Sequence, residues 1–417
     1  MSGRILIVGG GEAGLTIAVT LRELGHTGEI CLVGAEPFSP YQRPPLSKEY
    51  LTDGGDPAFL RAPEFYAAND IRLVTGRSVT SVERHAEGGA ATLDDGTVLE
   101  FSRLALATGS TPRRLPVPGA GADGVVALRT IDDAHVIRAG LECARDVVIV
   151  GGGFVGLEVA AAARARGAAV TVVEAADRVL GRVVAEPMST FVRRHHEAAG
   201  IRIETGRGVT GIGETDGRAD AVLLDDGEEV PADLVIVGVG AVPVTDLAVQ
   251  MGLQCRPGIV VDDHARSSDP GIVAAGDCAV QPHPHREGDL IGIESVNNAT
   301  EQGKVAAHSL LDMEPPTRGV PWFWSNQGAL KIQIAGISDG HDHYVIRRGA
   351  DDRLTVLYYR AGLLIAGDTV NDPREHMAIK RALAQGSTVD PAVAGDTSVP
   401  LKSLVTPAAG SGVPAPR

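Results

Sequence analysis

Cysteine is scarce in this sequence, and its arrangement does not suit thiol chemistry. The 417 residues include four cysteines, Cys31, Cys143, Cys255 and Cys278, and no two of them form a CxxC or CxxxxC pair. A redox disulfide is therefore not expected. We predict that all four behave as small buried hydrophobic residues in a reducing compartment.

Basic charge and long apolar runs are also lacking. The formal net charge is −15, which disfavours nucleic acid as a partner. No apolar stretch approaches the roughly 20 residues of a membrane span. The first strand-like run, Arg4 to Val8, begins almost at Met1, so we expect no signal peptide and a cytoplasmic location.

Motifs for metal binding and for a serine nucleophile are missing as well. There is no HExxH, no Cys/His cluster and no Gly-x-Ser-x-Gly, so we expect no metal and no nucleophilic serine. The paired histidines are predicted to lie on the surface; they are His195 with His196, His283 with His285, and His341 with His343.

An internal repeat organises the first 240 residues. The run Ile5 to Val8 leads into Gly9-Gly-Gly-Glu-Ala-Gly14, a helical pattern and the run Ile30 to Val33. The same order recurs in Val147 to Val150, Gly151-Gly-Gly-Phe-Val-Gly156, a helical pattern and Val170 to Val173. Each half then has an Asp-Asp-Gly turn and a returning apolar run. The sequence therefore predicts two copies of one α/β dinucleotide-binding fold.

The glycine loops indicate phosphate binding. In Gly9-x-Gly11-x-x-Gly14 the first glycine allows a tight turn, the second lets a pyrophosphate approach, and the third lets helix and strand pack closely. The helix that follows offers free N–H groups to the phosphates. Gly151, Gly153 and Gly156 repeat the pattern. Two such loops in one chain predict a tightly held flavin and a diffusible nicotinamide.

One acidic residue distinguishes the two loops. Glu174 ends the run after the second loop, 18 residues beyond Gly156. A carboxylate there accepts hydrogen bonds from a ribose and repels a 2′-phosphate, which favours NADH over NADPH, although Arg178 is close enough in sequence to oppose that preference. The equivalent position of the first unit is Gly34, and the nearby Glu36 receives no assigned role.

A different pattern follows Gly240. Gly271 to Ala275 reads as one more buried strand, and Ser295 to Leu311 as a helix. Beyond Pro315-Pro316, a small antiparallel sheet and a terminal helix are predicted from Leu330–Ala335, Asp342–Arg347, Leu354–Tyr359, Leu363–Ala366 and Arg374–Ala384. Pro407 to Arg417 has the composition of a disordered tail.

Charge separates this last segment from the rest. Residues 318–417 carry 11 Lys/Arg and 9 Asp/Glu, whereas the preceding residues carry 27 and 44. The C-terminal segment is thus the candidate surface for an acidic partner, and its candidate contacts are Arg318, Lys331, Arg347 and Arg348.

The segment Pro40-Tyr-Gln-Arg-Pro-Pro-Leu-Ser-Lys48 resembles the putidaredoxin reductase and rhodocoxin reductase group of ferredoxin reductases, which are glutathione-reductase-like flavoproteins. The resemblance extends from Gly9 to about Ala384. Further segments that carry it are Ala107-Thr-Gly109, Leu128 to Ala134, Gly276-Asp277, Ser295 to Ala299 and Pro321 to Gln327. Asn326, in place of a usual aspartate, and Val244, in place of a common asparagine, depart from the group's pattern.

The resemblance implies that the first unit holds FAD. In it Arg43 is close to the phosphates, Asp277 bonds a ribityl hydroxyl, and Val296 donates its N–H near the pyrimidine edge. The full set of implied FAD residues is Gly9, Gly11, Ala13, Gly14, Ala35, Arg43, Lys48, Val82, Thr108, Gly109, Arg129, Gly276, Asp277, Glu294, Ser295, Val296 and Trp324.

The second unit, by the same resemblance, binds NADH. The implied NAD residues are Gly151, Gly153, Phe154, Val155, Gly156, Glu174 and Gly240. Lys48 reaches the flavin ring, Trp324 lies against it, and Glu158 approaches both Lys48 and the nicotinamide. These three residues are the implied catalytic set.

The predicted fold class is α/β, with two Rossmann-like dinucleotide-binding domains and a small C-terminal α+β domain. Residues 1–110 and 246–317 would bind FAD, 111–245 NAD, 318–400 would form an interface domain and 401–417 a tail. The predicted function is NADH-dependent reduction of a small acidic [2Fe–2S] ferredoxin that serves an oxygenase, by a monomer or homodimer. Alternatives are a reductase of a quinone, a radical or O2, and a redox sensor resembling apoptosis-inducing factor.

Overall fold

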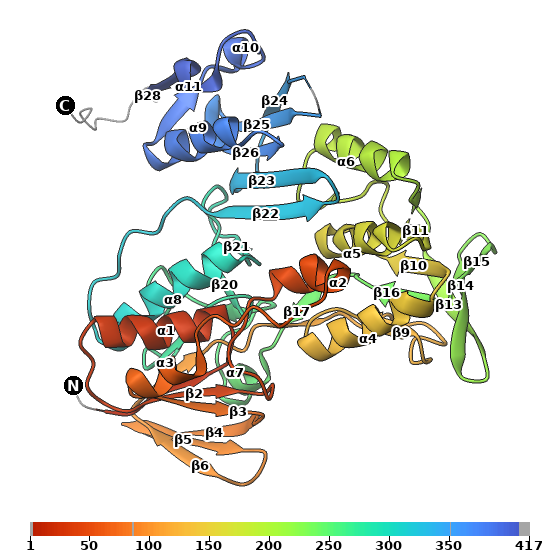
Figure 1. The fold of residues 1–417 in the computed structure, drawn as a ribbon. Helices are drawn as coiled ribbons and strands as arrows, with labels where there is room; N and C mark the ends of the chain where they lie inside the picture. Colours follow the sequence, from red (N-terminus) through yellow and green to blue (C-terminus); the bar gives the residue numbers. More distant parts are fainter. Residues whose placement is uncertain (1–2, 86, 351, 408–417) are drawn as a thin grey trace. The chain divides into compact units, whose positions relative to one another are not determined.

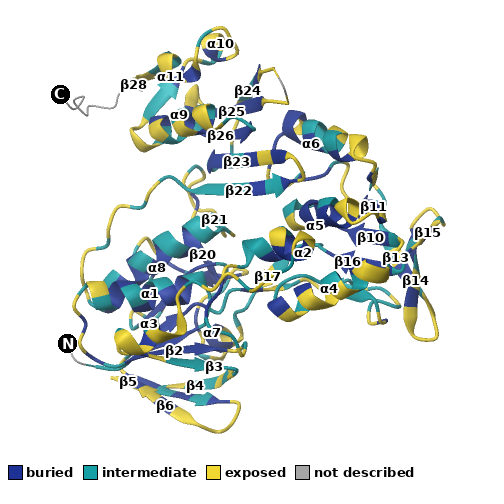
Figure 2. Cartoon of the chain, in the orientation of Figure 1, coloured by how far each residue is buried: buried dark blue, intermediate teal, exposed yellow. Residues whose placement is uncertain are grey.

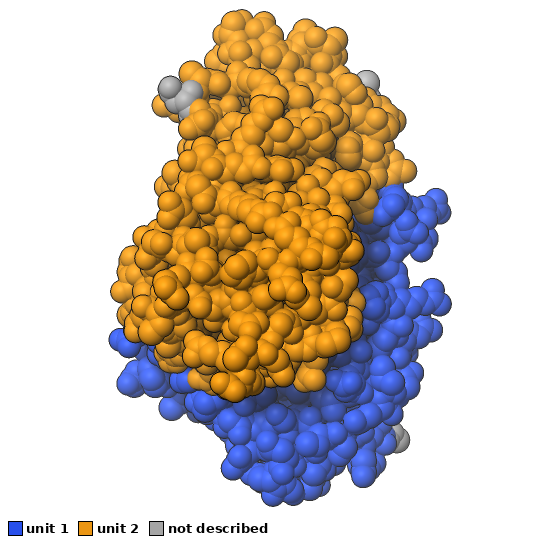
Figure 3. Space-filling view, turned by 90° about the vertical axis from the view of Figure 1, so that its right-hand side faces the viewer, with its two compact units in different colours: residues 1–45, 56–111, 241–319 blue, residues 46–55, 112–240, 320–417 orange. Residues whose placement is uncertain are grey.

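The computed structural model describes residues 3–85, 87–350 and 352–407. The chain forms two compact units, coloured blue and orange in Figure 3. Unit 1 comprises residues 1–45, 56–111 and 241–319, and unit 2 comprises residues 46–55, 112–240 and 320–417. The chain therefore passes between the two units several times. No helix in the described part of the chain is long and apolar enough to cross a membrane.

Unit 1 is built on a five-stranded parallel sheet. Its order is β19 (Ile272–Ala274), β7 (Arg103–Leu106), β1 (Ile5–Val8), β2 (Ile30–Gly34) and β3 (Ile71–Thr75). Strands β2 and β3 are labelled in Figure 1. Residues such as Ile5 and Ile7 pack with α1 (Glu12–Glu23) and α8 (Val296–Leu310) on one face. Leu6 and Val8 pack on the other face with β5 (Gly88–Leu93) and β6 (Val98–Phe101). Because both of their faces are covered, β1 and β2 are continuous apolar runs whose residues are all buried, and Figure 2 colours β2 as buried. In the edge strand β3 only Ile71 is buried, and Arg72 is exposed.

Shorter elements complete unit 1. They are α3 (Pro63–Ala68), β4 (Val79–His85), β8 (Ser110–Pro112), β17 (Ala241–Pro243), α7 (Asp246–Gln250), β18 (Ile259–Val260), β20 (Ala279–Pro282) and β21 (Leu290–Ile291), while η1 (Pro44–Ser47) crosses into unit 2. The predicted hairpin at Asp95-Gly96 is confirmed, since β5 and β6 pair antiparallel across it.

Unit 2 contains the second copy of the parallel sheet. Its order is β12 (Arg202–Thr205), β11 (Ala169–Glu174), β10 (Asp146–Val150), β16 (Leu234–Val237) and β9 (Val125–Ala127). Accompanying elements are α2 (Glu49–Thr52), α4 (Ile131–Cys143), α5 (Phe154–Ala165), α6 (Glu186–Ala198), β13 (Val209–Thr215), β14 (Arg218–Leu224) and β15 (Glu229–Pro231). The same strand–loop–helix order in both units confirms the predicted repeat.

The last part of unit 2 is a five-stranded antiparallel sheet. Its order is β22 (Trp322–Gln327), β23 (Leu330–Gly336), β26 (Leu363–Val370), β25 (Leu354–Arg360) and β24 (His343–Arg348). The predicted strands and terminal helix α9 (Pro373–Ala384) are confirmed, whereas β22 was not predicted as a strand. The segment expected to form a tail from residue 401 begins with α11 (Leu401–Leu404) and β28 (Val405–Pro407), after β27 (Ser387–Val389) and α10 (Pro391–Ala394); residues 408–417 lie outside the described residues.

A buried hydrogen-bonded group links this sheet to the start of α6. The Tyr358 hydroxyl donates to the carboxylate of Asp368 and accepts from the backbone N–H of Ala185 at 3.0 Å. Asp368 is fully buried, and burial raises the pKa of its carboxyl to about 7.

Replacing Asp368 with Asn is expected to flatten the dependence of stability on pH. The unfolded carboxyl ionises near its ordinary pKa of 3.8, whereas the folded one stays neutral until about 7. The contribution of the Asp368 carboxyl to the free energy of unfolding is therefore fully present below pH 3.8 and is lost as the pH rises through 7. The stability of Asp368→Asn relative to wild type should increase over that window by up to roughly 4 kcal/mol. Urea unfolding at a series of pH values measures this difference, and a difference that stays constant from pH 4 to pH 8 would contradict the assignment.

Candidate functional site

The first glycine loop has the geometry of a phosphate-binding turn. Gly9 has φ +124°, and a Cβ there would lie 1.9 Å from the carbonyl oxygen of Ala107. A Cβ at Gly14 would lie 2.0 Å from the carbonyl oxygen of Gly9, so the chain itself requires both glycines. At Gly11, which caps α1, a Cβ would have no other atom within 4 Å. The open space is therefore at the middle glycine, where a phosphate can approach the backbone.

Several implied FAD residues lie at one edge of the unit 1 sheet. Ala35 follows β2, Thr108-Gly109 follows β7, and Gly276-Asp277 follows β19. The carboxyl ends of parallel strands share an edge, so these residues lie at the same end of the sheet as the Gly9 loop. Asp277 accepts a hydrogen bond from the Ser110 hydroxyl at 3.1 Å. This edge fits a dinucleotide, because it combines an open helix N-terminus with a half-buried carboxylate.

Glu36, which had no predicted role, holds Arg43. The Arg43 guanidinium lies 2.6 Å from one carboxylate oxygen of Glu36, and the Tyr41 hydroxyl donates to the other. Arg43 also donates to the Tyr41 hydroxyl at 2.9 Å. The ion pair begins just beyond β2, on the same edge as the Gly9 loop.

The other implied FAD residues have more varied positions. Ser295 caps α8 by accepting from the N–H of Asn298 at 3.1 Å, and Glu294 and Val296 flank it. Val82 lies on β4, where it is partly buried and packs against the apolar core. Arg129 belongs to unit 2, where its backbone N–H donates to Asp133 at the start of α4.

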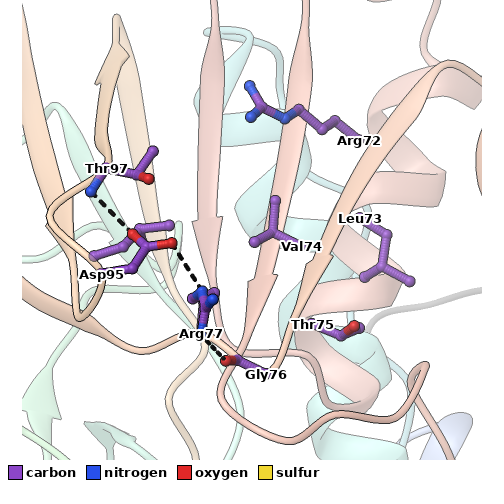
Figure 4. A pocket seen from close by; sticks show the side chains of 9 residues that line it. Arg72, Leu73, Val74, Thr75, Gly76, Arg77, Asp95 and Thr97 are labelled. Carbon is purple, nitrogen blue, oxygen red and sulfur yellow. Dashed lines mark hydrogen bonds and ion pairs between the residues drawn. The ribbon is translucent and has the colours of Figure 1, made fainter.

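A surface cavity of ≈ 460 Å³ lies beside β3 in unit 1 (Figure 4). It is lined by Arg72, Leu73, Val74, Thr75, Gly76, Arg77, Leu93, Asp95 and Thr97. Arg77 pairs with Asp95 at 2.9 Å across it. The lining includes no residue of the predicted cofactor set and none of the Gly9 loop.

The second glycine loop repeats the first one closely. Gly151 has φ +109°, and its Cβ would lie 2.4 Å from the Gly238 carbonyl oxygen. A Cβ at Gly156 would lie 2.3 Å from the Gly151 carbonyl oxygen, while the space at Gly153 is open. Phe154 and Val155 begin α5, and Gly240, with φ +103°, follows β16 on the same sheet edge.

Two backbone N–H groups bind the carboxylate of Glu174 beside the second glycine loop. Its two carboxylate oxygens accept from the N–H groups of Gly152 at 2.7 Å and Ala176 at 2.8 Å. A carboxylate offers about four acceptor positions, so roughly two are left for ribose hydroxyls. Arg178, the neighbour that could oppose NADH selectivity, donates instead to the carbonyl oxygens of Gly181 and Val184 at 2.8 and 2.7 Å.

Lys48 and Glu158 form a buried ion pair within unit 2. Their charged atoms are 2.8 Å apart, and the side chains are only 10% and 4% exposed. The hydroxyls of Ser47 and Ser325 also donate to the Glu158 carboxylate. The structure therefore brings together two of the three implied catalytic residues, although they are 110 positions apart in sequence.

Strand β22 supplies groups that the sequence analysis missed. Phe323 packs on Phe154 with ring centroids 4.8 Å apart, and the Gln327 amide donates to the Phe154 carbonyl oxygen at 3.1 Å. Alternate residues of a strand share a face, so the spacing of Phe323, Ser325 and Gln327 could have indicated that these three side chains lie on one face of β22. Trp324 points to the opposite face and packs on Trp322, with centroids 5.4 Å apart.

Two histidines predicted on the surface are buried. His196 is 1% exposed and contacts the Gln327 side-chain oxygen at 3.0 Å; burial lowers its pKa to about 4. Met188, Val192 and His196 lie on the buried face of α6, which explains the error. His283 is also buried, whereas His341 and His343 are exposed as predicted.

The cysteines are free, and only two of the four are fully buried. Cys31 and Cys278 are buried, and burial raises the pKa of each thiol. Cys143 is exposed, which contradicts the prediction for that residue because it ends α4 on the solvent side. Among the described residues no group of three or more His, Cys, Asp or Glu could hold a metal ion.

Two of the four candidate partner-binding cations, Arg318 and Arg347, bind groups of the protein itself. Arg347 is 2% exposed, where it pairs with Glu375 at 2.9 Å and donates to the carbonyl oxygens of Ala394, Asp396 and Val399. It is therefore a structural residue, contrary to the prediction. Arg318 is half-buried and donates to the Gln281 side chain; burial lowers its pKa. Lys331 and Arg348 are exposed.

Comparison with known proteins agrees with this arrangement. Residues 3–303 match the family model of the pyridine nucleotide-disulphide oxidoreductases, and residues 322–405 match a reductase C-terminal domain. Rhodocoxin reductase of Rhodococcus erythropolis is 42% identical over 404 residues, which cover 96% of this chain and 94% of that protein. Putidaredoxin reductase of Pseudomonas putida is 40% identical over 412 residues, 97% of each chain.

The solved structures lead to the same group. The chain in the covalent putidaredoxin reductase–putidaredoxin complex matches with a TM-score of 0.92 at 40% identity, covering 96% of this chain and 98% of that one. The ferredoxin reductase for the CYP199A2 system of Rhodopseudomonas palustris matches with a TM-score of 0.91 at 41% identity, covering 96% and 99%. The predicted fold class is confirmed, and the chain belongs to the pyridine nucleotide-disulphide oxidoreductase family.

Proposed function

We propose that this oxidoreductase takes electrons from NADH through FAD and delivers them to a small acidic [2Fe–2S] ferredoxin. The observation that carries the proposal is the pair of glycine loops of one geometry, each with open space at its middle glycine. Two dinucleotide sites in one chain suit a flavin and a nicotinamide. The relatives named as redoxin reductases, and the solved reductase–putidaredoxin complex, support a ferredoxin as the acceptor.

The two cofactors divide between the two loops. The edge formed by Gly11, Ala35, Thr108 and Asp277 would hold FAD, with Arg43 as the cation for its phosphates. The edge formed by Gly153, Gly240 and Glu174 would hold NADH. Accordingly we assign residues 1–110 and 246–317 to FAD binding, 111–245 to NAD binding and 318–400 to an interface domain.

The chain's own residues would act by position and charge. FAD, when bound, accepts a hydride and gives up electrons one at a time. The protein contributes mainly by holding the reactants in register, because hydride transfer needs alignment more than acid–base catalysis. We assign Lys48 to the flavin ring and Trp324 to its packing, with Glu158 fixing the Lys48 ammonium at 2.8 Å.

The absence of a disulfide among the four cysteines supports an electron acceptor outside the chain. The family name refers to disulphides, but all four cysteines are free, and Cys278, next to Asp277, has a raised pKa because it is buried. The thiolate is the reactive form, so this thiol is a poor nucleophile. With no thiol pair to receive them, electrons would leave for a separate carrier, for which the exposed Lys331 and Arg348 are candidate contacts.

Glu174→Ala is expected to weaken the preference for NADH. The substitution removes the ribose acceptor and the negative charge that repels a 2′-phosphate, so reduction by NADH should slow by roughly 10-fold while reduction by NADPH improves. The ratio of kcat/KM for the two nucleotides measures the effect. Asp177→Ala, three positions along the same loop, is the control and should leave the ratio unchanged. An unaltered ratio in Glu174→Ala would exclude the assigned role.

The spectrum of the purified protein tests the proposed function. We expect flavin bands at about 375 and 450 nm, rapid bleaching by NADH, and then reduction of a [2Fe–2S] ferredoxin in many turnovers. A colourless protein would contradict the FAD assignment. Bleaching followed by turnover only with quinones or O2 would favour a small-molecule reductase, and a long-lived reduced species without turnover would favour a redox sensor. Sedimentation of the same sample distinguishes monomer from homodimer.

A further inference from the structure

The Glu158 carboxylate lies at the end of a hydrogen-bonded chain that starts on α6. His196 contacts the side-chain oxygen of Gln327 at 3.0 Å, and the Gln327 amide nitrogen donates to the Ser325 hydroxyl at 2.8 Å. The Ser325 hydroxyl then donates to Glu158. Ser325 and Gln327 are 0% exposed, so water does not compete for these bonds.

The direction of every bond in this chain can be assigned. The Phe154 carbonyl can only accept, so the amide nitrogen of Gln327 must face it, at 3.1 Å. The Gln327 oxygen therefore faces His196, whose ring nitrogen must carry the hydrogen. Because burial lowers the pKa of His196 to about 4, the ring is neutral at pH 7, and it serves as a fixed donor. Every donated hydrogen in the series from His196 through Gln327 to Ser325 therefore points toward the Glu158 carboxylate.

The same carboxylate receives two further donors from residues 46–55. Its second oxygen accepts from the Ser47 hydroxyl and from the Lys48 ammonium. An ionised carboxylate only accepts, so this set of donors matches its charged form on both oxygens. Removing the Ser325 hydroxyl would leave the first oxygen of a buried anion without that donor, which is costly and would let the carboxylate rotate away from Lys48.

We propose that Ser325 and Gln327 of β22 are positioning residues that hold Glu158, and through it Lys48, in the geometry that hydride transfer requires. This rests on the proposed function for the step affected. Ser325 acts directly on the carboxylate. Gln327 acts one bond further away, and it also links the carboxylate to Phe154, which lies in the second glycine loop and begins α5. The C-terminal sheet is then part of the nicotinamide site as well as a candidate partner surface.

Two variants and two controls test the proposal on the flavin-containing protein. Ser325→Ala and Gln327→Leu remove the donors, and Ser325→Thr restores the hydroxyl. Thr369→Val removes another buried hydroxyl of the same sheet, one that donates to the Gln333 carbonyl at 3.2 Å and has no bond to Glu158. It therefore controls for a general loss of stability.

The first readout does not depend on the flavin. A water-soluble acetylating reagent labels Lys48 and the exposed Lys331, and mass spectrometry gives the ratio of the two rates. We expect Ser325→Ala and Gln327→Leu to raise the relative labelling of Lys48 several-fold. The reason is the loss of one hydrogen bond to a charged group, which weakens the hold on Lys48. Ser325→Thr and Thr369→Val should match wild type.

The second readout is stopped-flow bleaching by NADH. The limiting rate should fall on the order of 10-fold in Ser325→Ala, with little change in the NADH concentration for half-saturation, and Ser325→Thr should recover it. Rates and labelling equal to those of Thr369→Val would overturn the proposal, as would altered labelling with an unchanged limiting rate. Failure of wild type to bleach would instead refute the proposed function, and the labelling ratio would still decide whether β22 holds the ion pair.

Discussion

Gly156→Val should severely slow reduction by NADH while the protein remains yellow. A Cβ at this position would lie 2.3 Å from the Gly151 carbonyl oxygen, and valine adds two methyl groups to that clash. The turn that presents the second loop to a pyrophosphate must then open. Because a displacement of about 1 Å can slow an enzyme 100-fold, we expect the rate of bleaching by NADH to fall on the order of 100-fold or more. Dithionite should still bleach the flavin, which shows that the flavin itself is intact.

The matched variant in the first loop should give the reciprocal result. A Cβ at Gly14 would lie 2.0 Å from the Gly9 carbonyl oxygen, so Gly14→Val opens the loop assigned to FAD. This variant should be purified with little or no flavin. The flavin absorbance per protein and the rate of NADH bleaching, measured on both variants, check the assignment of cofactors to loops. A colourless Gly156→Val together with a yellow Gly14→Val would reverse that assignment.

Arg347→Met should destabilise the C-terminal sheet by about 3–5 kcal/mol, the usual result of removing one partner of a buried ion pair. The substitution leaves the Glu375 carboxylate without its cation and three carbonyl oxygens without a donor. Urea unfolding followed by tryptophan fluorescence is a suitable measurement. Both tryptophans of the chain, Trp322 and Trp324, lie on β22 of this sheet.

The neighbouring arginine provides the control. Arg348 is the next residue on β24 but is exposed, so Arg348→Met should change stability by no more than about 0.5 kcal/mol. If the two variants unfold at the same urea concentration, burial of the Arg347 charge does not stabilise this sheet. The two variants also test ferredoxin binding, because Arg348 remains a candidate contact while Arg347 cannot reach a partner.

The sequence was sufficient to predict the features that depend on local geometry. A glycine loop between an apolar strand and a helix has a narrow set of physical explanations, and both loops have the predicted close contacts. The inner strands of both parallel sheets were visible as apolar runs because both of their faces are covered. The edge strands β3, β9 and β12 were not predicted, because β3 and β12 include polar residues and none of the three is fully buried. The edge that gathers Ala35, Thr108 and Asp277 follows from the direction of parallel strands.

Features that depend on contacts between distant segments could not be predicted in this way. Ser325 reaches Glu158 across 167 positions, and only the packing of β22 against α5 brings them together. The resemblance to reductases implied that Glu158 approaches Lys48, but nothing in the residues indicated the donors around them. Arg347 appeared to be a surface cation, because the carbonyls that accept its hydrogen bonds come from the last residue of α10 and from the irregular chain after it.

The way in which the chain passes between the two units limits how the protein can be dissected or recombined. Residues 46–55 are separated in sequence from the rest of unit 2, yet they carry Ser47 and Lys48, and β22 carries Ser325. A fragment of residues 112–240 would keep the second glycine loop but would lose three donors to a buried carboxylate. A chimaera that exchanges nicotinamide specificity with a relative therefore has to exchange three discontinuous segments together. Recombination points chosen from the linear sequence alone would separate Glu158 from its cation.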